Sequence, residues 1–181
     1  MKRLLAGIAL AALAAAPAYA AIKVGDKAPD FTAQASQAGK PFTYSLKAQL
    51  KKGPVVLYFY PAAFTSGCNI EAHEVAEATD QYKALGATVI GVSHDGIDKL
   101  NQFSADTRYC SGKFPVAADP TGTVIKSYDA VLAIKPEYAN RTSYVIAPNG
   151  KVIYEYTSMD PSKHVENTMA ALKAGKAGGK S

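Results

Sequence analysis

Apolar and polar residues follow one another in blocks that predict strands and helices by turns. Residues 55–60 are a continuous apolar and aromatic run, which is typical of a strand covered on both faces. From Ala72 to Leu85 the apolar residues recur at steps of three and four, which predicts a helix with one buried stripe that ends at Gly86. Residues 87–93 form the next apolar run. A strand, a crossover helix and a second strand predict a right-handed parallel unit.

The same alternation continues along the rest of the chain. The remaining predicted elements are a helix at 97–108, a strand at 114–118, a short helix at 123–131, strands at 142–147 and 151–156, and a closing helix at 161–172. Asn149 and Gly150 separate the last two strands, and Asn-Gly between strand-like runs indicates a hairpin. The pattern therefore predicts an α/β protein with a central mixed sheet and helices on both faces, in the element order of a thioredoxin-like fold.

Both ends of the chain are predicted to lie outside the folded domain. A basic stretch at 1–3, an apolar run at 4–16 and a small-x-small site at 18–20 are the three parts of a secretory signal peptide, with cleavage after residue 20. We therefore expect export to an oxidising compartment, the bacterial periplasm. The folded domain is expected at 21–172, followed by a flexible Gly/Lys-rich tail at 173–181.

Composition and charge exclude several classes of protein. The chain has 181 residues, of which 48% are hydrophobic and 19% charged, so it is too apolar to be disordered and too short for several large domains. Its net charge of +5 includes no basic block longer than the pair Lys51 and Lys52, which argues against nucleic-acid binding and stable membrane association. Two cysteines are too few for a disulfide scaffold. They either form one disulfide bridge, act as reactive thiols or are buried and inert.

Cys68 is the first candidate for chemistry. It follows a strand and a turn and stands at the start of a helix, where backbone N–H groups and the helix dipole favour a thiolate over a thiol. The spacing of Pro61, Thr65 and Cys68 would turn the threonine hydroxyl and the backbone donors toward one small cup that suits a short polar substrate. A buried, inert cysteine is the alternative that this position makes less favourable.

The residues around Cys68 resemble the active-site signature of the peroxiredoxins, which are thiol-dependent peroxidases. The signature covers residues 60–68, with Glu71 three residues later. Further segments that resemble the family in order and spacing lie at 28–31, 93–95 and 114–122, and at Arg141 before the strand at 142–147. The similarity spans nearly the whole chain after the signal peptide, and it is greatest to the bacterioferritin-comigratory, or Q-type, subgroup.

The resemblance implies a role for each of these residues. Cys68 would be the peroxidatic cysteine, Thr65 would orient the peroxide and hydrogen-bond the thiolate, and Arg141 would stabilise the thiolate and the charge that develops on the peroxide. Glu71 would hold Arg141 by a charge-assisted bond. The substrate-binding set would comprise Pro61, which shields the site from water, with Thr65, Gly67 and Arg141.

Cys110 is the candidate for the second step. A sulfenic acid on Cys68 must be captured by a thiol before further oxidation inactivates it. Many Q-type relatives carry that thiol five residues after the first cysteine, but this position is His73 here. Since some relatives resolve from the helix predicted at 97–108, an intramolecular Cys68–Cys110 disulfide is expected. Resolution by an external thiol, with Cys110 as a bystander, is the alternative.

The activity implied by the resemblance is reduction of hydrogen peroxide and small organic hydroperoxides by a monomer. No metal or organic cofactor is implied, and the reductant would be a thioredoxin-like or other dithiol protein. One alternative is an exported redox or copper-binding protein of the same fold without peroxidase turnover. Another is a thiol-disulfide oxidoreductase, which the lack of a Cys-x-x-Cys motif disfavours. The three histidines, His73, His94 and His164, are interpreted as structural or surface residues.

Overall fold

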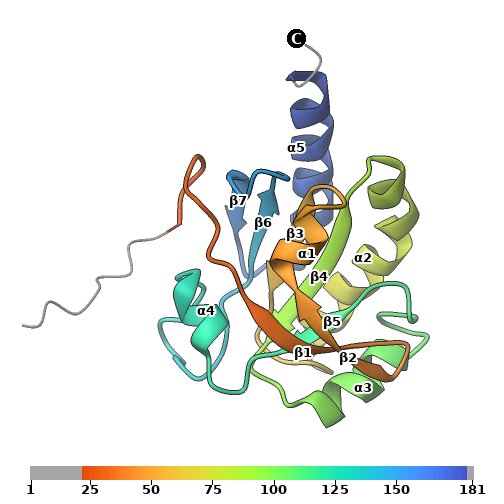
Figure 1. The fold of residues 1–181 in the computed structure, drawn as a ribbon. Coiled ribbons are helices and arrows are strands. Elements are labelled where there is room, and N and C mark those ends of the chain that lie inside the picture. Colours follow the sequence, from red (N-terminus) through yellow and green to blue (C-terminus); the bar gives the residue numbers. More distant parts are fainter. Residues whose placement is uncertain (1–21, 179–181) are drawn as a thin grey trace, which may run out of the picture.

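One mixed sheet of seven strands runs through the centre of the protein (Figure 1). The computed structural model describes residues 22–178, so the predicted signal peptide lies outside the described residues. The strands are β1 (Thr32–Gln37), β2 (Lys40–Ser45), β3 (Val55–Phe59), β4 (Thr88–Ser93), β5 (Val116–Ala118), β6 (Thr142–Ile146) and β7 (Val152–Thr157), in the order β2-β1-β5-β4-β3-β6-β7. β3, β4 and β5 are parallel neighbours, and the β6–β7 hairpin is antiparallel, which confirms the predicted architecture.

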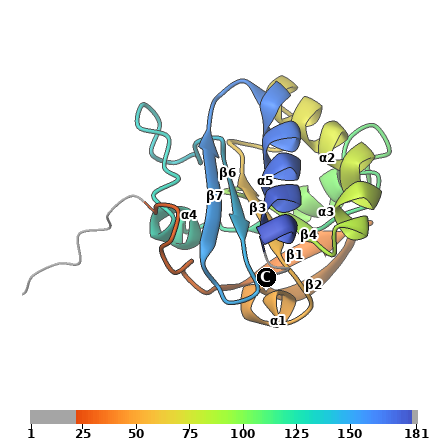
Figure 2. The ribbon, with the colours of Figure 1, turned by 90° about the horizontal axis from the view of Figure 1, so that it is seen from above.

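Helices cover both faces of the sheet (Figures 1 and 2). They are α1 (Leu46–Leu50), α2 (Ser66–Ala84), α3 (Ile97–Ala105), α4 (Thr123–Ser127) and α5 (His164–Gly178), with a 3-10 turn, η1 (Pro161–Lys163), before α5. One apolar core lies between the sheet and α2, α3 and α5, and the second lies between the sheet and α1 and α4. Among the described helices none is long and apolar enough to span a membrane.

The two cores explain why β3 is apolar at every position. Val56 and Tyr58 face the core under α2, whereas Val55, Leu57 and Phe59 face the core under α1 and α4. Successive side chains of a strand point to opposite faces, so a strand in the middle of a doubly covered sheet cannot alternate between apolar and polar residues.

Several elements begin or end at other residues than the pattern predicts. The helix predicted at 97–108 ends at Ala105, because the Asp106 carboxylate accepts the backbone N–H of Arg108 (2.9 Å) and closes a turn instead. The helix predicted at 123–131 ends at Ser127, since Asp129 adopts a left-handed backbone conformation.

The two ends of the described chain also differ from the prediction. The β1–β2 hairpin and α1 precede the first strand that the pattern predicts. At the other end, α5 continues to Gly178, so the closing helix predicted to end at residue 172 extends into the segment expected as a tail. Lys176 lies in the last turn of α5, where a cation interacts favourably with the helix dipole.

Candidate active site

The loop between β3 and α2 carries most of the predicted site. The chain leaves β3 at Phe59 and enters α2 at Ser66, and Thr65 is the residue that precedes the helix, with extended backbone. Cys68 therefore lies in the first turn of α2, as predicted, where unpaired backbone N–H groups and the helix dipole favour an anion. Its side chain is buried, with 2% of the residue exposed. A nucleophile here is shielded from bulk water.

A carboxylate from the neighbouring strand holds this loop in place. The Asp95 Oδ2 atom accepts the backbone N–H of Ala63 (2.7 Å) and the hydroxyl of Ser93 (2.9 Å), and Lys99 Nζ lies 2.7 Å from Oδ1. Because β3 and β4 are parallel neighbours, their carboxyl ends meet at one edge of the sheet and Asp95 can reach the loop. Asp95 stands in the family pattern at 93–95, but the sequence does not indicate this anchoring contact.

Phe64 links the same loop to the segment before Cys110. Its φ of 67° lies in the left-handed region, which is costly for a residue with a side chain. Its ring packs edge-on against Phe103 and Tyr109, with ring centroids 5.1 and 6.0 Å apart. These contacts hold the strained conformation, so the backbone next to Cys68 is coupled to the turn that carries Cys110.

Arg141 reaches Cys68 from the opposite side of the loop. Thr142, the first residue of β6, pairs with Phe59 at the end of β3, and this register places Arg141 beside the start of the loop. Its Nη2 atom lies 3.5 Å from Cys68 Sγ, and its Nη1 atom donates to Glu71 Oε2. Three residues that the family pattern singles out therefore meet in one place, although Arg141 is 73 positions from Cys68.

The Glu71–Arg141 ion pair is almost completely buried, with side chains 0% and 3% exposed. Burial raises the pKa of Glu71 to about 7, although the adjacent Arg141 opposes this rise. Burial alone would lower the pKa of Arg141, but Glu71 and Cys68 outweigh it and the pKa is raised. The guanidinium therefore stays charged against the sulfur.

The remaining predicted substrate-binding residues lie in the loop between β3 and α2 and in the first turn of α2. The Thr65 hydroxyl donates to the carbonyl oxygen of Ala62 (2.9 Å), so its lone pairs are left to accept, and its predicted bond to the thiolate stays a prediction. Pro61 and Gly67 are half-buried beside the sulfur-bearing turn. A Cβ atom at Gly67 would lie 3.0 Å from Arg141 Nη2, so only glycine lets the guanidinium approach this closely.

Gly67→Ala is expected to slow peroxide reduction about tenfold while leaving the free energy of unfolding unchanged or slightly higher. The new methyl group would displace the Arg141 nitrogen that contacts Cys68, whereas alanine suits a helix better than glycine. Gly96→Ala is the matched control, because no atom lies within 4 Å of a Cβ added there. Stopped-flow peroxide consumption and denaturant unfolding of both variants measure the two effects. Full activity of Gly67→Ala would contradict the tight fit.

Cys110 lies outside this cluster, in the turn after α3. Both cysteines are free thiols in this structure, and Cys110 is fully buried. Burial raises the pKa of Cys110 well above its usual range, and the nearby Asp106 adds to the rise. The thiol therefore has neither the exposure nor the ionisation that a reactive cysteine needs, unless the turn moves.

His164 is a residue of the site that the sequence interpretation did not single out. It begins α5 and is 2% exposed, with its Nδ1 atom 3.7 Å from Glu71 Oε1. A lone histidine carries no signal in the sequence, because its contact with α2 depends on how α5 packs. Among residues 22–178 no group of three or more His, Cys, Asp or Glu side chains is arranged to hold a metal ion.

Comparisons with known proteins agree with the geometry. The model of the AhpC/TSA family matches residues 24–155. A putative peroxiredoxin of Mycobacterium tuberculosis is 31% identical over 160 residues, which cover 87% of this chain and 100% of that protein. The chloroplastic peroxiredoxin Q of Arabidopsis thaliana is 34% identical over 157 residues, or 86% of this chain and 69% of that one.

Solved structures give the same result. The crystal structure of peroxidoxin BcpB from Mycobacterium tuberculosis has a TM-score of 0.73 and 32% identity, and the match covers 84% of this chain and 97% of that chain. A cysteine-to-serine variant of PrxQ from Xylella fastidiosa has a TM-score of 0.76 with 23% identity, covering 87% and 99% of the two chains. The second similarity concerns the fold alone.

Proposed function

We propose, from the premise that the chain belongs to the AhpC/TSA family as a peroxiredoxin of the Q type, that this thiol peroxidase reduces hydroperoxides at Cys68. The observation that carries the proposal is the buried contact between Arg141 Nη2 and Cys68 Sγ at the first turn of α2. A redox or copper-binding protein without peroxidase turnover is not favoured by the same relationships.

The first step follows from the groups at this site. The Cys68 thiolate attacks one peroxide oxygen, the S–O bond forms and the O–O bond breaks, so the sulfur is oxidised to a sulfenic acid and the peroxide is reduced to an alkoxide or hydroxide. That leaving group takes a proton from solvent. Arg141 remains protonated and acts as a fixed positive charge that stabilises the thiolate before attack and the leaving oxygen during attack. Glu71 holds the guanidinium in place.

We assign the second step to Cys110. Its thiol would attack the sulfenic sulfur, forming a disulfide and releasing water, after which a thioredoxin-like or other dithiol protein reopens the bond by exchange. A disulfide needs Cα atoms within about 7 Å. Since Cys110 is fully buried and both thiols are free, we propose that the turn between α3 and β5 opens locally to bring the two sulfurs together. The ion pair between the half-buried Asp106 and the exposed Arg108 in this turn opposes that movement only weakly.

One equivalent of hydrogen peroxide is expected to convert both free thiols of the wild-type protein into a single Cys68–Cys110 disulfide within one chain. Thiol titration and peptide mapping without reduction measure the product, and Cys110→Ser, which should stop at a sulfenic acid that dimedone traps on Cys68, is the control. Only intermolecular bridges would contradict resolution within one chain, whereas a trapped sulfenic acid in the wild type would show that Cys110 is a bystander and that an external thiol resolves the enzyme.

The place of action and the assembly belong to the same proposal. The signal-peptide pattern at 1–20 supports export, and an exported peroxidase needs a reductant that works in an oxidising compartment. We propose that it acts in the periplasm as a monomer, with the dithiol protein as its transient partner.

A further inference from the structure

We propose that His164 is a positioning residue that fixes Arg141 and Glu71 in the arrangement that presents the guanidinium to Cys68. The proposal rests on the proposed role of Cys68 and extends the site to a third element, α5. Three sets of observations carry it: the hydrogen bonds of the buried imidazole, the way a short turn holds Arg141, and the position of the free oxygen of Glu71.

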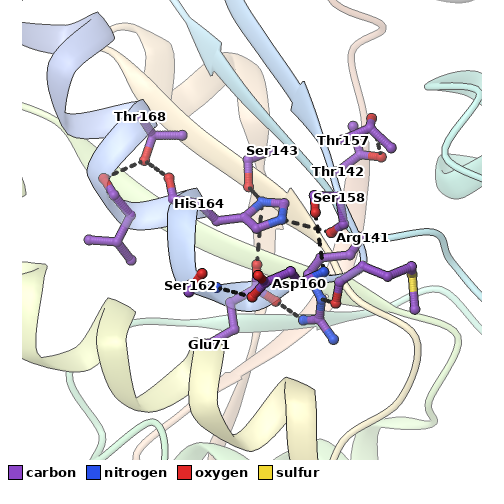
Figure 3. Close-up of polar contacts among 12 residues, drawn as sticks. Glu71, Arg141, Thr142, Ser143, Thr157, Ser158, Asp160, Ser162, His164 and Thr168 are labelled. Carbon is purple, nitrogen blue, oxygen red and sulfur yellow. Dashed lines mark hydrogen bonds and ion pairs between the residues drawn. The ribbon is translucent and has the colours of Figure 1, made fainter.

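The imidazole is held at both nitrogens (Figure 3). Its Nε2 atom lies 2.9 Å from the carbonyl oxygen of Ser158, and its Nδ1 atom lies 2.8 Å from the hydroxyl oxygen of Ser143. A carbonyl oxygen can only accept, so Nε2 carries the proton and Nδ1 accepts from Ser143. The ring also packs edge-on against Tyr156, with centroids 4.9 Å apart. His164 is thus fixed in one orientation and one tautomer.

The turn that His164 holds is the turn that holds Arg141 (Figure 3). The backbone N–H of Ser158 donates to the carbonyl oxygen of Arg141 (3.1 Å), and the carbonyl oxygen of Met159 accepts from Arg141 Nε (3.2 Å). His164 Nε2 donates to the carbonyl oxygen of Ser158, which lies along the backbone between the Ser158 N–H and the Met159 carbonyl. Without that bond, the Ser158–Met159 turn loses a side-chain hydrogen bond from α5, and the acceptor of Arg141 Nε is held less firmly.

The second contact concerns Glu71. Its Oε2 atom accepts from Arg141, whereas Oε1 is buried without a hydrogen-bond partner and lies 3.7 Å from His164 Nδ1. A neutral imidazole with its proton on Nε2 offers no N–H to Oε1 and leaves the carboxylate to one cation. A protonated imidazole would offer a second N–H to Oε1 and compete with Arg141 for the same carboxylate.

The charges around the imidazole favour its neutral form. The titratable groups that face it are Glu71 from α2, Arg141 before β6, Asp160 in the turn before η1 and Tyr156 from β7. Burial lowers the pKa of His164, and Arg141 lowers it further, against the Ser158 carbonyl and Asp160, which raise it. The lowered pKa favours the neutral imidazole, in agreement with the hydrogen bonds that its two nitrogens make to Ser158 and Ser143.

The test compares two substitutions of His164 in a Cys110→Ser background, in which Cys68 is the one thiol whose reactions are measured. His164→Phe keeps a planar ring but removes both nitrogens, whereas in His164→Gln the amide N–H replaces Nε2–H and keeps the bond to Ser158. We expect His164→Phe to slow the first reaction with hydrogen peroxide about tenfold and to move the pH profile of Cys68 alkylation by iodoacetamide to higher pH. His164→Gln is expected to restore most of the reaction rate and most of the original alkylation profile. His73→Phe, on the exposed face of α2, is the matched control and should change neither.

A second background shows whether His164 acts through Arg141. Arg141→Lys keeps a positive charge beside Glu71 but removes Nε. Adding His164→Phe in this background should therefore slow the first reaction with hydrogen peroxide little further. An equal loss in both backgrounds, or unchanged rate and alkylation profile in a folded His164→Phe protein, would overturn the proposal. If the phenylalanine variant does not unfold cooperatively, His164→Asn makes the same test, because asparagine reaches Ser143 but not Ser158.

The alkylation profile requires no peroxide and therefore separates this proposal from the proposed function. If the Cys110→Ser protein consumes peroxide no faster than a free thiol, the assignment of peroxide reduction to Cys68 fails. The response of the alkylation profile to His164→Phe then still shows whether His164 positions the guanidinium.

Discussion

Cys68→Ser is expected to reduce the rate of peroxide consumption by about a thousandfold or more, to the level of the buffer. A serine hydroxyl in the first turn of α2 is not ionised near neutral pH, so the helix dipole and Arg141 have no anion to stabilise. Cys110 is unsuited to take over the reaction, because it is fully buried and burial raises its pKa well above its usual range. Stopped-flow mixing of each reduced variant with a slight excess of hydrogen peroxide measures the effect.

Cys110→Ser is the matched control for this loss, since it also replaces one buried sulfur by oxygen. It should leave the first turnover within about twofold of the wild type and block only the formation of the disulfide. The reverse pattern, with activity retained in Cys68→Ser and lost in Cys110→Ser, would move the nucleophile to Cys110. Slow consumption in both variants and in the wild type would contradict peroxide reduction at Cys68 altogether.

Local sequence patterns predict the elements that build the site. The uninterrupted apolar run of β3 and the helical repeat of α2 place Cys68 at a strand–helix junction, because β3 is buried at every position in the middle of the sheet and α2 packs one buried stripe against it. The β1–β2 hairpin lacks such a pattern. Of its twelve strand residues only Ala35, Tyr44 and Ser36 are fully or nearly buried, and two of these are small. With so few buried positions, the edge strand β2 and its neighbour β1 leave little apolar periodicity to detect.

Long-range contacts could not be predicted from such patterns. The family resemblance places Arg141 and Glu71 with Cys68, but their meeting depends on the register of β6 against β3. The contact between His164 and Glu71 depends in the same way on the packing of α5 over α2 and β6.

Cys110 shows a different limit of sequence patterns. The sequence predicts a helix at 97–108, rich in polar residues, just before Cys110, and nothing in it indicates that the turn after α3 buries Cys110 completely. The ring of Tyr109 packs against Phe103 and Phe64, and this aromatic contact draws the turn onto the core. A single aromatic residue in a polar stretch gives no periodic signal, so the burial of its neighbour could not be predicted.

Arg141→Met is expected to lower the rate of peroxide reduction by a factor of about 10² to 10³ and the free energy of unfolding by about 3 kcal/mol. The rate falls because the only fixed cation in contact with Cys68 Sγ among the described residues is lost. Stability falls because Glu71, whose side chain is 0% exposed, loses its partner and must either stay charged in the core or take up a proton, and both cost free energy. Arg108→Met is the matched control: it removes an exposed arginine from an ion pair with Asp106 and should change neither quantity measurably.

The double variant Arg141→Met/Glu71→Gln separates the two effects. Removing the carboxylate together with the guanidinium leaves no uncompensated buried charge, so most of the lost stability should return, measured as the denaturant midpoint. The rate should stay low, because glutamine supplies no positive charge to the sulfur or to the leaving oxygen. Recovery of both would show that Arg141 acts only by balancing Glu71 within the core. Recovery of stability alone means that one buried ion pair serves two purposes: Glu71 makes a cation tolerable in the core, and Arg141 presents that cation to Cys68.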